Sequence, residues 1–142
     1  MTIAAILATK GNQVISISGD RSVQQAVTLL TARRIGAVPV VEDHRVLGVF
    51  SERDVVHVLE RDGAAALDRT VAEVMTAPAI TVTPDESVLG ALALMTRRRI
   101  RHLPVVEGET CIGFVSIGDL VKFRIERIEA EAEAMRAYIQ AA

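Results

Sequence analysis

The stretch at residues 35–54, IGAVPVVEDHRVLGVFSERD, returns at residues 100–119 as IRHLPVVEGETCIGFVSIGD. The repeat extends beyond this stretch: residues 15–56 align with residues 80–121 without a gap, and 18 of the 42 aligned pairs are identical. A chain that carries the same pattern twice is expected to form two half-modules that face each other, because neither copy alone would bury enough apolar surface to be stable. Any site on one copy then has a counterpart on the other.

Composition and charge narrow the class of protein. Of the 142 residues, 50% are hydrophobic and 24% are charged, so the chain can bury a substantial core. A formal net charge of −2 and an aromatic content of 3% argue against nucleic acid or a membrane surface as the partner. No apolar run reaches the roughly 18 residues of a membrane span, and the start of the chain lacks a signal-sequence pattern. The single cysteine, Cys111, is expected to be a small core residue in a reducing cytoplasm.

Both copies predict the same order of elements. Alternating β-branched residues predict a short strand, Ser22 and Ser87 are expected to cap amphipathic helices, and two apolar runs around a polar turn predict a hairpin that leads into a second helix. Thr70 and Glu73 form a capping-box pattern for a helical turn before the second copy. Residues 2–7 resemble this turn in the first copy, which has three extra residues around positions 10–12. The predicted strands cover residues 14–17, 37–41 and 46–50 in the first copy and residues 80–83, 102–106 and 111–115 in the second.

These elements predict an α+β fold of two pseudo-symmetric β-α-β-β-α repeats that pack through their sheets, with helices covering the sheets. The first repeat is expected over residues 2–62 and the second over residues 70–123. A linker is expected over residues 63–69, and an extension of the last helix over residues 124–142.

The predicted last helix carries an apolar seam beyond the repeat. Its apolar residues are spaced alternately by four and three positions, which makes an a/d seam of nearly three heptads. Two interpretations stand: the seam packs on its own domain, or it pairs with another protomer. The length of the seam, on a helix that runs past the repeat, favours a homodimer. The seam residues are Val121, Ile125, Ile128, Ala132, Met135 and Ile139.

In each copy a predicted strand enters a helix through the pattern Gly-x-x-Ser-x-x-Asp, at residues 48–54 and 113–119. Such a junction presents free backbone N–H groups, and the helix dipole favours an anion there. The serine hydroxyl can donate to a phosphate or ribose oxygen, the aspartate can accept from two vicinal sugar hydroxyls, and Arg53 adds a charged donor for phosphate. The same pattern is also an ordinary capping box, with the serine as N-cap.

In order and in duplicate, these features resemble a pair of cystathionine-β-synthase-type (CBS) domains, known as a Bateman module, over residues 2–121. The resemblance rests on Asp-x-x-Val-x-x-Ala at residues 20–26 and 85–91, on the Pro-Val-Val strands at residues 35–41 and 100–106, and on the two junctions. It implies a non-enzymatic regulatory module that binds adenine nucleotides in the clefts between the halves and transmits a conformational change to a partner. AMP is the expected ligand, with ATP, ADP or NAD(H) as alternatives.

The resemblance also implies a set of binding residues. Asp54 and Asp119 would hold ribose hydroxyls, and Ser51 and Ser116 would contact ribose or phosphate. Residues before the first strand of each copy would pair with the adenine edge or wall it, and residues before each Pro-Val-Val would sandwich the base with backbone and apolar contacts. The first group is Thr9, Lys10, Val14, Ile15, Thr76, Ala77, Ala79 and Ile80, and the second is Ala37, Val38, His102 and Leu103.

Charge distinguishes the two copies. The first has Arg53 beside its aspartate, whereas the second has Arg101 and His102 before its proline and Lys122 one turn beyond its aspartate. This difference predicts two non-equivalent sites, which hold different ligands or of which only one is occupied. Neutral drift at exposed positions is the alternative interpretation.

The densest basic stretch is the run of arginines at residues 97–99, with Arg101 close behind. Such a run is typical of a solvated helix end, where cations are favourable. Phosphate binding across the cleft is the next interpretation, and nucleic-acid binding is the last.

Catalysis and metal binding are not expected. His44, His57 and His102 lack metal-ligand spacing, and the chain has no nucleophile elbow, Walker loop or GxGxxG pattern. The sequence therefore predicts a nucleotide-binding regulatory module that forms a homodimer and acts on an unidentified protein target. The alternatives are a structural dimerisation or interaction module with vestigial ligand sites, an enzyme that consumes a nucleotide, and a nucleic-acid binder.

Overall fold

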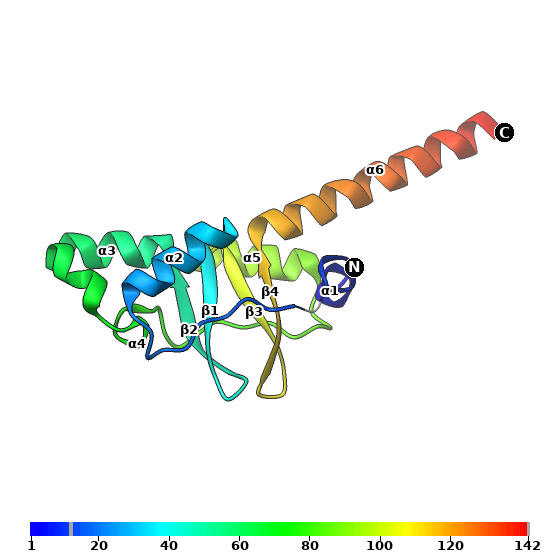
Figure 1. Cartoon of the computed structure of the whole chain (residues 1–142). Coiled ribbons are helices and arrows are strands. Elements are labelled where there is room, and N and C mark those ends of the chain that lie inside the picture. The colour runs from blue at the N-terminus through cyan, green and yellow to red at the C-terminus, as the bar shows by residue number, and fades with distance from the viewer. Residues whose placement is uncertain (12, 142) are drawn as a thin grey trace.

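The computed structural model describes residues 1–11 and 13–141, and in it two similar units stand side by side (Figure 1). Asn12, among the predicted extra residues, and Ala142, at the end of the predicted helix extension, lie outside the described residues. The predicted α+β fold of two β-α-β-β-α repeats with a long last helix is confirmed. The elements are α1 (Ile3–Lys10), α2 (Val23–Arg33), β1 (Ala37–Glu42), β2 (Arg45–Ser51), α3 (Glu52–Asp62), the 3₁₀ helix η1 (Gly63–Asp68), α4 (Val71–Val74), α5 (Val88–Arg98), β3 (His102–Glu107), β4 (Thr110–Ser116) and α6 (Ile117–Ala141).

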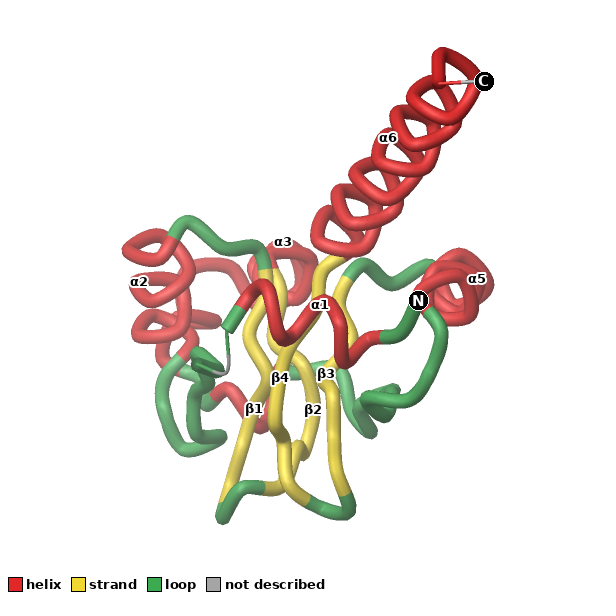
Figure 2. Tube along the Cα trace, turned by 90° about the vertical axis from the view of Figure 1, so that its right-hand side faces the viewer, coloured by secondary structure: helices red, strands yellow, loops and turns green. Residues whose placement is uncertain are grey.

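The two hairpins have the same register. β1 pairs antiparallel with β2, and β3 with β4, so that Ala37 lies opposite Ser51 and His102 opposite Ser116. In each hairpin the pairing register shifts once, at the same place. The shift comes directly after Val40 and Val105, which lie opposite Gly48 and Gly113. The hairpins stand against each other in the middle of the molecule, with α2 on one side and α5 on the other (Figure 2).

The strands predicted at residues 14–17 and 80–83 are reduced to single bridges. Ile17 pairs in parallel with Val40, and Val82 with Val105. The Ile17 amide donates to the Pro39 carbonyl at 3.2 Å, and the Ile17 carbonyl accepts from the Val41 amide at 2.9 Å. Both segments are therefore extended third members of their sheets, but each pairs at one residue only.

Helix caps follow the predicted positions. Ser22 and Gln25 form a reciprocal capping box at the start of α2, Ser87 accepts from the Gly90 amide at the start of α5, and Thr70 accepts from the Glu73 amide at the start of α4. α2 and α5 end at Arg34 and Arg99, which have left-handed φ angles of 54° and 55°. These two residues turn the chain from each helix toward the following strand.

The leading helix of each copy packs on the other copy. Ile3, Ile6 and Leu7 of α1 belong to the buried cluster of the second unit, together with Val88 and Met95 of α5. Conversely, Val71 of α4 belongs to the cluster of the first unit, which also contains Val23 and Phe50. Backbone hydrogen bonds hold both helices on the opposite copy. The Ile3 amide donates to the Glu86 carbonyl at 2.9 Å, and the Val71 amide donates to the Arg21 carbonyl at 2.8 Å. Each hydrophobic core therefore contains residues from both predicted repeats.

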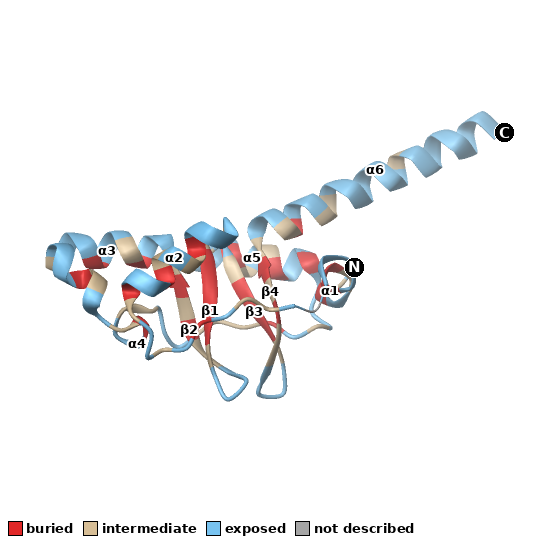
Figure 3. Cartoon of the chain, viewed as in Figure 1, coloured by how far each residue is buried: buried red, intermediate tan, exposed pale blue. Residues whose placement is uncertain are grey.

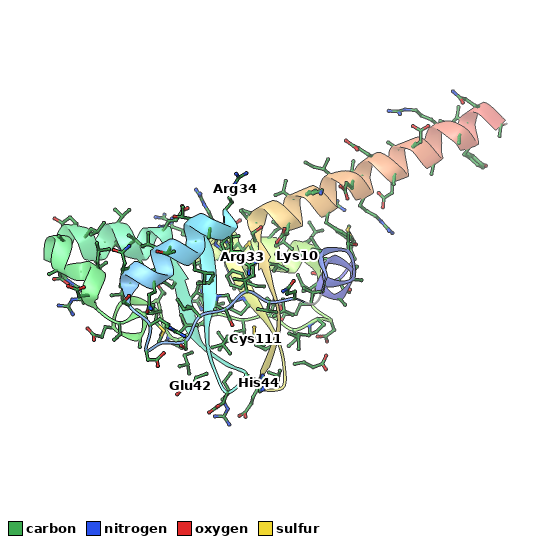
Figure 4. All side chains as sticks on the ribbon, in the orientation of Figure 1. Lys10, Arg33, Arg34, Glu42, His44 and Cys111 are labelled. Carbon is green, nitrogen blue, oxygen red and sulfur yellow. The ribbon has the colours of Figure 1, made fainter. Side chains whose placement is uncertain are left out.

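The hairpin tips meet each other. The Cys111 amide donates to the His44 carbonyl at 2.8 Å, and Arg45 forms an ion pair with Glu109 at 2.7 Å (Figure 4). Cys111 is half-buried, and neither buried cluster contains it, so its prediction as a core residue is wrong. Its place between two hairpins shields it partly, and this burial raises the pKa of its thiol.

α6 leaves the body of the molecule after its first turns. Leu120 is buried in the second core and Phe123 packs against it, whereas the rest of the helix projects outward and is mostly exposed (Figures 1 and 3). The predicted seam does not pack on its own domain: Val121, Ile125 and Ile139 are 42%, 49% and 65% exposed. None of the described helices combines the length and apolar character needed to cross a bilayer.

Candidate functional site

A cleft of about 460 Å³ lies between the two units. Four parts of the chain line it: Gly36 before β1, the β2–α3 junction of the first copy, residues 76–80 before the second copy, and residues 98–102 between α5 and β3. The cleft is therefore built by both copies. Its lining residues are Gly36, Val49, Ser51, Glu52, Arg53, Asp54, Thr76, Pro78, Ala79, Ile80, Arg98, Arg99, Ile100, Arg101 and His102.

Asp54 both caps α3 and faces this cleft. Its Oδ2 accepts from the Ser51 amide at 2.9 Å and from the Ser51 hydroxyl at 3.2 Å, which completes the predicted capping box. Its Oδ1 accepts from the Thr76 hydroxyl at 2.9 Å. Because each carboxylate oxygen can accept two hydrogen bonds, Oδ1 keeps one free position. The side chain is 9% exposed, so a ligand would reach this position only from the cleft.

Four arginines gather around the same cleft. Arg53 comes from the first turn of α3, whereas Arg98, Arg99 and Arg101 come from the end of α5 and the turn after it. Arg53 Nη1 donates to the carbonyl of Arg99 at 3.3 Å, which joins the two units across the cleft. Glu52 and Asp54 are the carboxylates in the lining, so positive charge exceeds negative charge and an anion is the favoured occupant.

The β4–α6 junction differs from its counterpart. Asp119 accepts from the Ser116 amide at 2.8 Å, as in the first copy, but its other contact is an ion pair with Lys10 of α1 at 2.7 Å (Figure 4). Lys10 also donates to the Phe114 carbonyl at 2.6 Å. Burial acts to raise the pKa of Asp119, but the hydrogen bonds from Lys10 and Ser116 outweigh it and hold that pKa below its usual range. Lys10 and the Ser116 amide thus share Oδ2 of Asp119, whereas Thr76 binds Oδ1 of Asp54.

His102 lies between the two junctions. His102 lines the cleft between the two units, and its ring stacks on the ring of Phe114, with a centroid distance of 5.5 Å and an interplanar angle of 11°. Burial is the largest influence on the pKa of His102 and lowers it, and the positive charge of Lys10 lowers it further. The opposing effects of Asp119 and Glu52 are smaller. The favoured form at neutral pH is the uncharged imidazole, which offers one donor and one acceptor.

Comparison with known proteins decides the family. CBS domains match the chain twice, over residues 5–61 and 71–126. The chain belongs to the CBS domain family. The CBS domain-containing protein CBSX3, mitochondrial, of Arabidopsis thaliana is 35% identical over 148 residues, which covers 98% of this chain and 72% of that protein.

Solved structures agree with this assignment. A CBS-domain containing protein from Agrobacterium tumefaciens is similar with a TM-score of 0.82 at 36% identity, covering 87% of this chain and 92% of that one. A CBS domain pair crystallised with 5′-methylthioadenosine and S-adenosyl-L-methionine has a TM-score of 0.79 at 22% identity, with coverage of 89% and 98%, and so shares the fold. The resemblance drawn from the repeat is thereby confirmed.

The CBS repeats bring together only part of the predicted binding set. Eight of those residues line the cleft between the two units: Ser51, Arg53, Asp54, Thr76, Ala79, Ile80, Arg101 and His102. Ala77 is exposed between two lining residues. Lys10, Ser116 and Asp119 meet at the other junction, and Lys122 is exposed on α6.

Six other predicted residues are not among those that line the cleft: Thr9, Val14, Ile15, Ala37, Val38 and Leu103. Val38 and Leu103 are fully buried in the two cores, and Ala37 is also buried, so these residues offer a base their backbone rather than their side chains. Val38 and Leu103 occupy equivalent positions in β1 and β3 and pack in the two cores, whereas Ala37, next to Val38 in the strand, points to the opposite face and is buried there. Thr9 is exposed and its hydroxyl donates to the Ala5 carbonyl of its own helix at 3.3 Å. Val14 and Ile15 are half-buried, with Ile15 packed on the first core.

The sequence reasoning missed the position of Arg98 and Arg99. The interpretation of this arginine run as a solvated helix end is correct in so far as Arg98 is the last residue of α5 and Arg99 its C-cap. The left-handed turn at Arg99, however, brings that end into the cleft. The separate charge sets assigned to two sites are also wrong, because Arg53 of one copy and Arg101 and His102 of the other line the same cleft.

Metal binding has no support in the part of the chain that the structure describes. Residues 1–11 and 13–141 contain no group of three or more His, Cys, Asp or Glu side chains placed to hold a metal ion.

Proposed function

We propose that this chain is a non-enzymatic sensor that binds an adenine nucleotide in the cleft between its CBS repeats. One observation carries the proposal: a single cleft combines a sugar-type acceptor, Asp54, with a group of arginines supplied by the other repeat. A ligand that uses both carries a hydrogen-bond donor, such as a sugar hydroxyl, and an anionic group, as a nucleotide does.

Asp54 and Thr76 suit a ribose. One hydroxyl would donate to the free position on Asp54 Oδ1, and its neighbour would donate to the Thr76 hydroxyl oxygen, which already donates to Asp54 at 2.9 Å. The capping role of Asp54 is compatible with this contact, because the bonds from Ser51 fix the carboxylate in place. Pro78, Ala79 and Ile80 give the cleft an apolar wall for the base.

The four arginines of the cleft are suited to bind a phosphate group. Arg98, Arg99 and Arg101 are exposed on one side of the cleft and Arg53 on the other, so a bound phosphate would draw both repeats toward it. A volume of about 460 Å³ is nearer the lower end of ligand cavities and favours a mononucleotide over a dinucleotide. AMP is therefore the first choice, with ADP, ATP and NAD(H) as alternatives. The CBS domain pair that was crystallised with two adenine-containing compounds supports adenine as the base of the ligand.

Binding of this kind would give a signal. Because the ligand would contact α3 of one repeat and the α5–β3 turn of the other, it would favour the arrangement in which both contacts are made. A protein target would sense this arrangement through the exposed helices, and we expect the chain to act as a homodimer. Its lone cysteine is consistent with a reducing compartment such as the cytoplasm.

Isothermal titration of AMP, ADP, ATP, NAD⁺, NADH and adenosine tests the proposal. The wild type is expected to bind at least one nucleotide with micromolar affinity, and Asp54→Ala should weaken that binding by at least about tenfold through loss of a charged acceptor. Arg101→Ala should weaken AMP binding by about tenfold and leave adenosine within about twofold, because only the phosphate contact is lost. Asp68→Ala, at an exposed aspartate outside the cleft, is the matched control.

The outcomes separate the alternatives. Circular dichroism of Asp54→Ala checks that the α3 cap is not needed for folding. Absence of binding to every nucleotide would contradict the proposal and leave a structural interaction module with vestigial sites. Turnover of a bound nucleotide would instead point to an enzyme. Salt-dependent binding of DNA that is lost with Arg98→Ala and Arg99→Ala would indicate a nucleic-acid site.

A further inference from the structure

The outer part of α6 presents an apolar seam with no partner in the monomer. Val121, Ile125, Ile128, Met135 and Ile139 are between 42% and 65% exposed. Leu120 and Phe123, which pack on the body, lie on a different side of the helix, so the seam faces away from the body. The helix projects into solvent along most of its length (Figure 3). Exposed apolar residues in a continuous row call for a partner.

The seam has the heptad pattern of a coiled coil. Ile125, Ala132 and Ile139 occupy a positions, and Val121, Ile128 and Met135 occupy d positions, which gives six layers. Ile125 and Ile139 at a positions are typical of two strands, whereas Ile128 at a d position is typical of three or four, so sedimentation decides the number of strands.

The charges beside the seam select a parallel, in-register pair. In such a pair each g residue faces the e residue five positions later on the other helix. Arg124 would then face Glu129 of the second copy, and Glu131 would face Arg136. Each pair forms twice because of the two-fold axis, so all four contacts between charged g and e residues are attractive.

An antiparallel pair is much less favourable. With full overlap of the six layers its centre falls at residue 130, so Glu129 and Glu131 each meet their own copies across the axis. A shift by one heptad removes this repulsion but leaves Met135 and Ile139 without partners. Only the parallel arrangement covers the whole seam and satisfies the charges.

We propose that α6 binds α6 of a second copy of this chain as a parallel, in-register, two-stranded coiled coil. The two bodies then lie at the same end of the coiled coil, on either side of its axis. The second copy is the partner because the same short segment supplies both the apolar layers and the complementary charges.

Sedimentation equilibrium of the full chain tests the pairing. The wild type is expected at twice the monomer mass of 15.3 kDa. Ile128→Glu, which places a charge in a central layer, should raise the dissociation constant at least about 100-fold. Ala130→Glu, at an exposed position on the opposite side of the same helix, is the matched control and should remain dimeric. A monomeric or trimeric wild type, or an Ile128→Glu variant that still dimerises, would overturn the proposal.

Charge exchange tests the register. Arg124→Glu alone and Glu129→Arg alone should each weaken the dimer at least about fivefold, because two attractive pairs become repulsive. The variant with both changes should regain most of the wild-type affinity. A double variant weaker than either single one would contradict the parallel register, since in the antiparallel pair these two residues do not face each other.

Cysteine crosslinking tests the direction. In a Cys111→Ala background, Ile139→Cys should form a disulfide between protomers under mild oxidation, because in register the two positions share one layer. An antiparallel pair would hold these cysteines about 27 Å apart. Ala130→Cys, away from the seam, is the control. Crosslinking through position 130 but not 139 would overturn the proposal.

Discussion

Gly48 and Gly113 occupy the same position in the two CBS repeats, but their surroundings differ. A Cβ atom on Gly48 would lie 2.6 Å from the Thr76 carbonyl oxygen, which accepts from the Val49 amide and cannot withdraw without breaking that bond. A Cβ atom on Gly113 would lie 2.6 Å from the end of the Leu7 side chain, which can change its rotamer. Only glycine fits the first position without movement of the backbone.

We therefore predict that Gly48→Ala destabilises the protein more than Gly113→Ala does. The expected loss for Gly48→Ala is about 1–3 kcal/mol in the free energy of unfolding, measured by urea titration. Because Thr76 also holds Asp54, nucleotide affinity should fall with it, whereas Gly113→Ala should retain affinity. Equal losses in the two variants would show that the backbone contact at Gly48 is unimportant.

The ion pair between Lys10 and Asp119 should control the protonation of His102. The pKa of His102 is lowered by burial first and by Lys10 second. In Lys10→Met the nearby Asp119 carboxylate would act on the imidazole without the opposing charge of Lys10, so we expect the pKa of His102 to rise. NMR titration of the histidine C–H resonances measures this change, and His102→Gln identifies the resonance. A His102 pKa that is unchanged or lower in Lys10→Met would contradict the ion-pair account.

The same pKa shift predicts how stability depends on pH. Because folding lowers the pKa of His102, the unfolded chain binds the proton more readily than the folded chain. The contribution of His102 to stability is therefore complete above its ordinary pKa of 6.5 and is lost as the pH falls below that value. Asp119 also loses its contribution on acidification, but only below its ordinary pKa of 3.8. Urea titrations between pH 5 and pH 7.5 isolate the histidine.

At the scale of elements, local chemistry accounts for most of what could be predicted. Ser22, Thr70 and Ser87 cap helices where the sequence places them, because a capping hydroxyl acts within three residues of itself. The hairpins were also predictable from apolar runs around a polar turn. The bridges at Ile17 and Val82 could not be foreseen as such, because pairing at a single residue depends on where the hairpin strand lies.

The exchange of leading helices gives an element-scale prediction. Leu7→Ala lies in the first repeat by sequence but removes apolar contacts from the core of the second, so it should cost about 2–4 kcal/mol in the free energy of unfolding. Unfolding should remain a single transition, because each core contains a helix from the other repeat. Thr9→Ala, on the exposed side of α1, is the control and should change stability by less than about 0.5 kcal/mol. Two separate transitions in Leu7→Ala would show that the repeats fold independently.

At the scale of the whole molecule, the two repeats are alike in fold and unlike in their clefts. The arginines of both copies line one cleft, and the aspartate of the other junction is already paired with Lys10. The first junction therefore faces a cleft whose arginines favour an anion. At the second junction, Lys10 already neutralises the charge of Asp119. This asymmetry is why the proposed nucleotide site is assigned to the cleft of Asp54.

The sequence by itself determined the duplication, the CBS fold, the helix caps and the seam of α6, because each depends on residues a few positions apart or on a pattern repeated at a fixed interval. Only the tertiary structure decided which residues share a cleft. The end of α5 reaches Arg53 because the two units face each other, and Lys10 reaches Asp119 because α1 crosses to the second core. These contacts join residues 46 and 109 positions apart, a separation that no local pattern in the chain encodes.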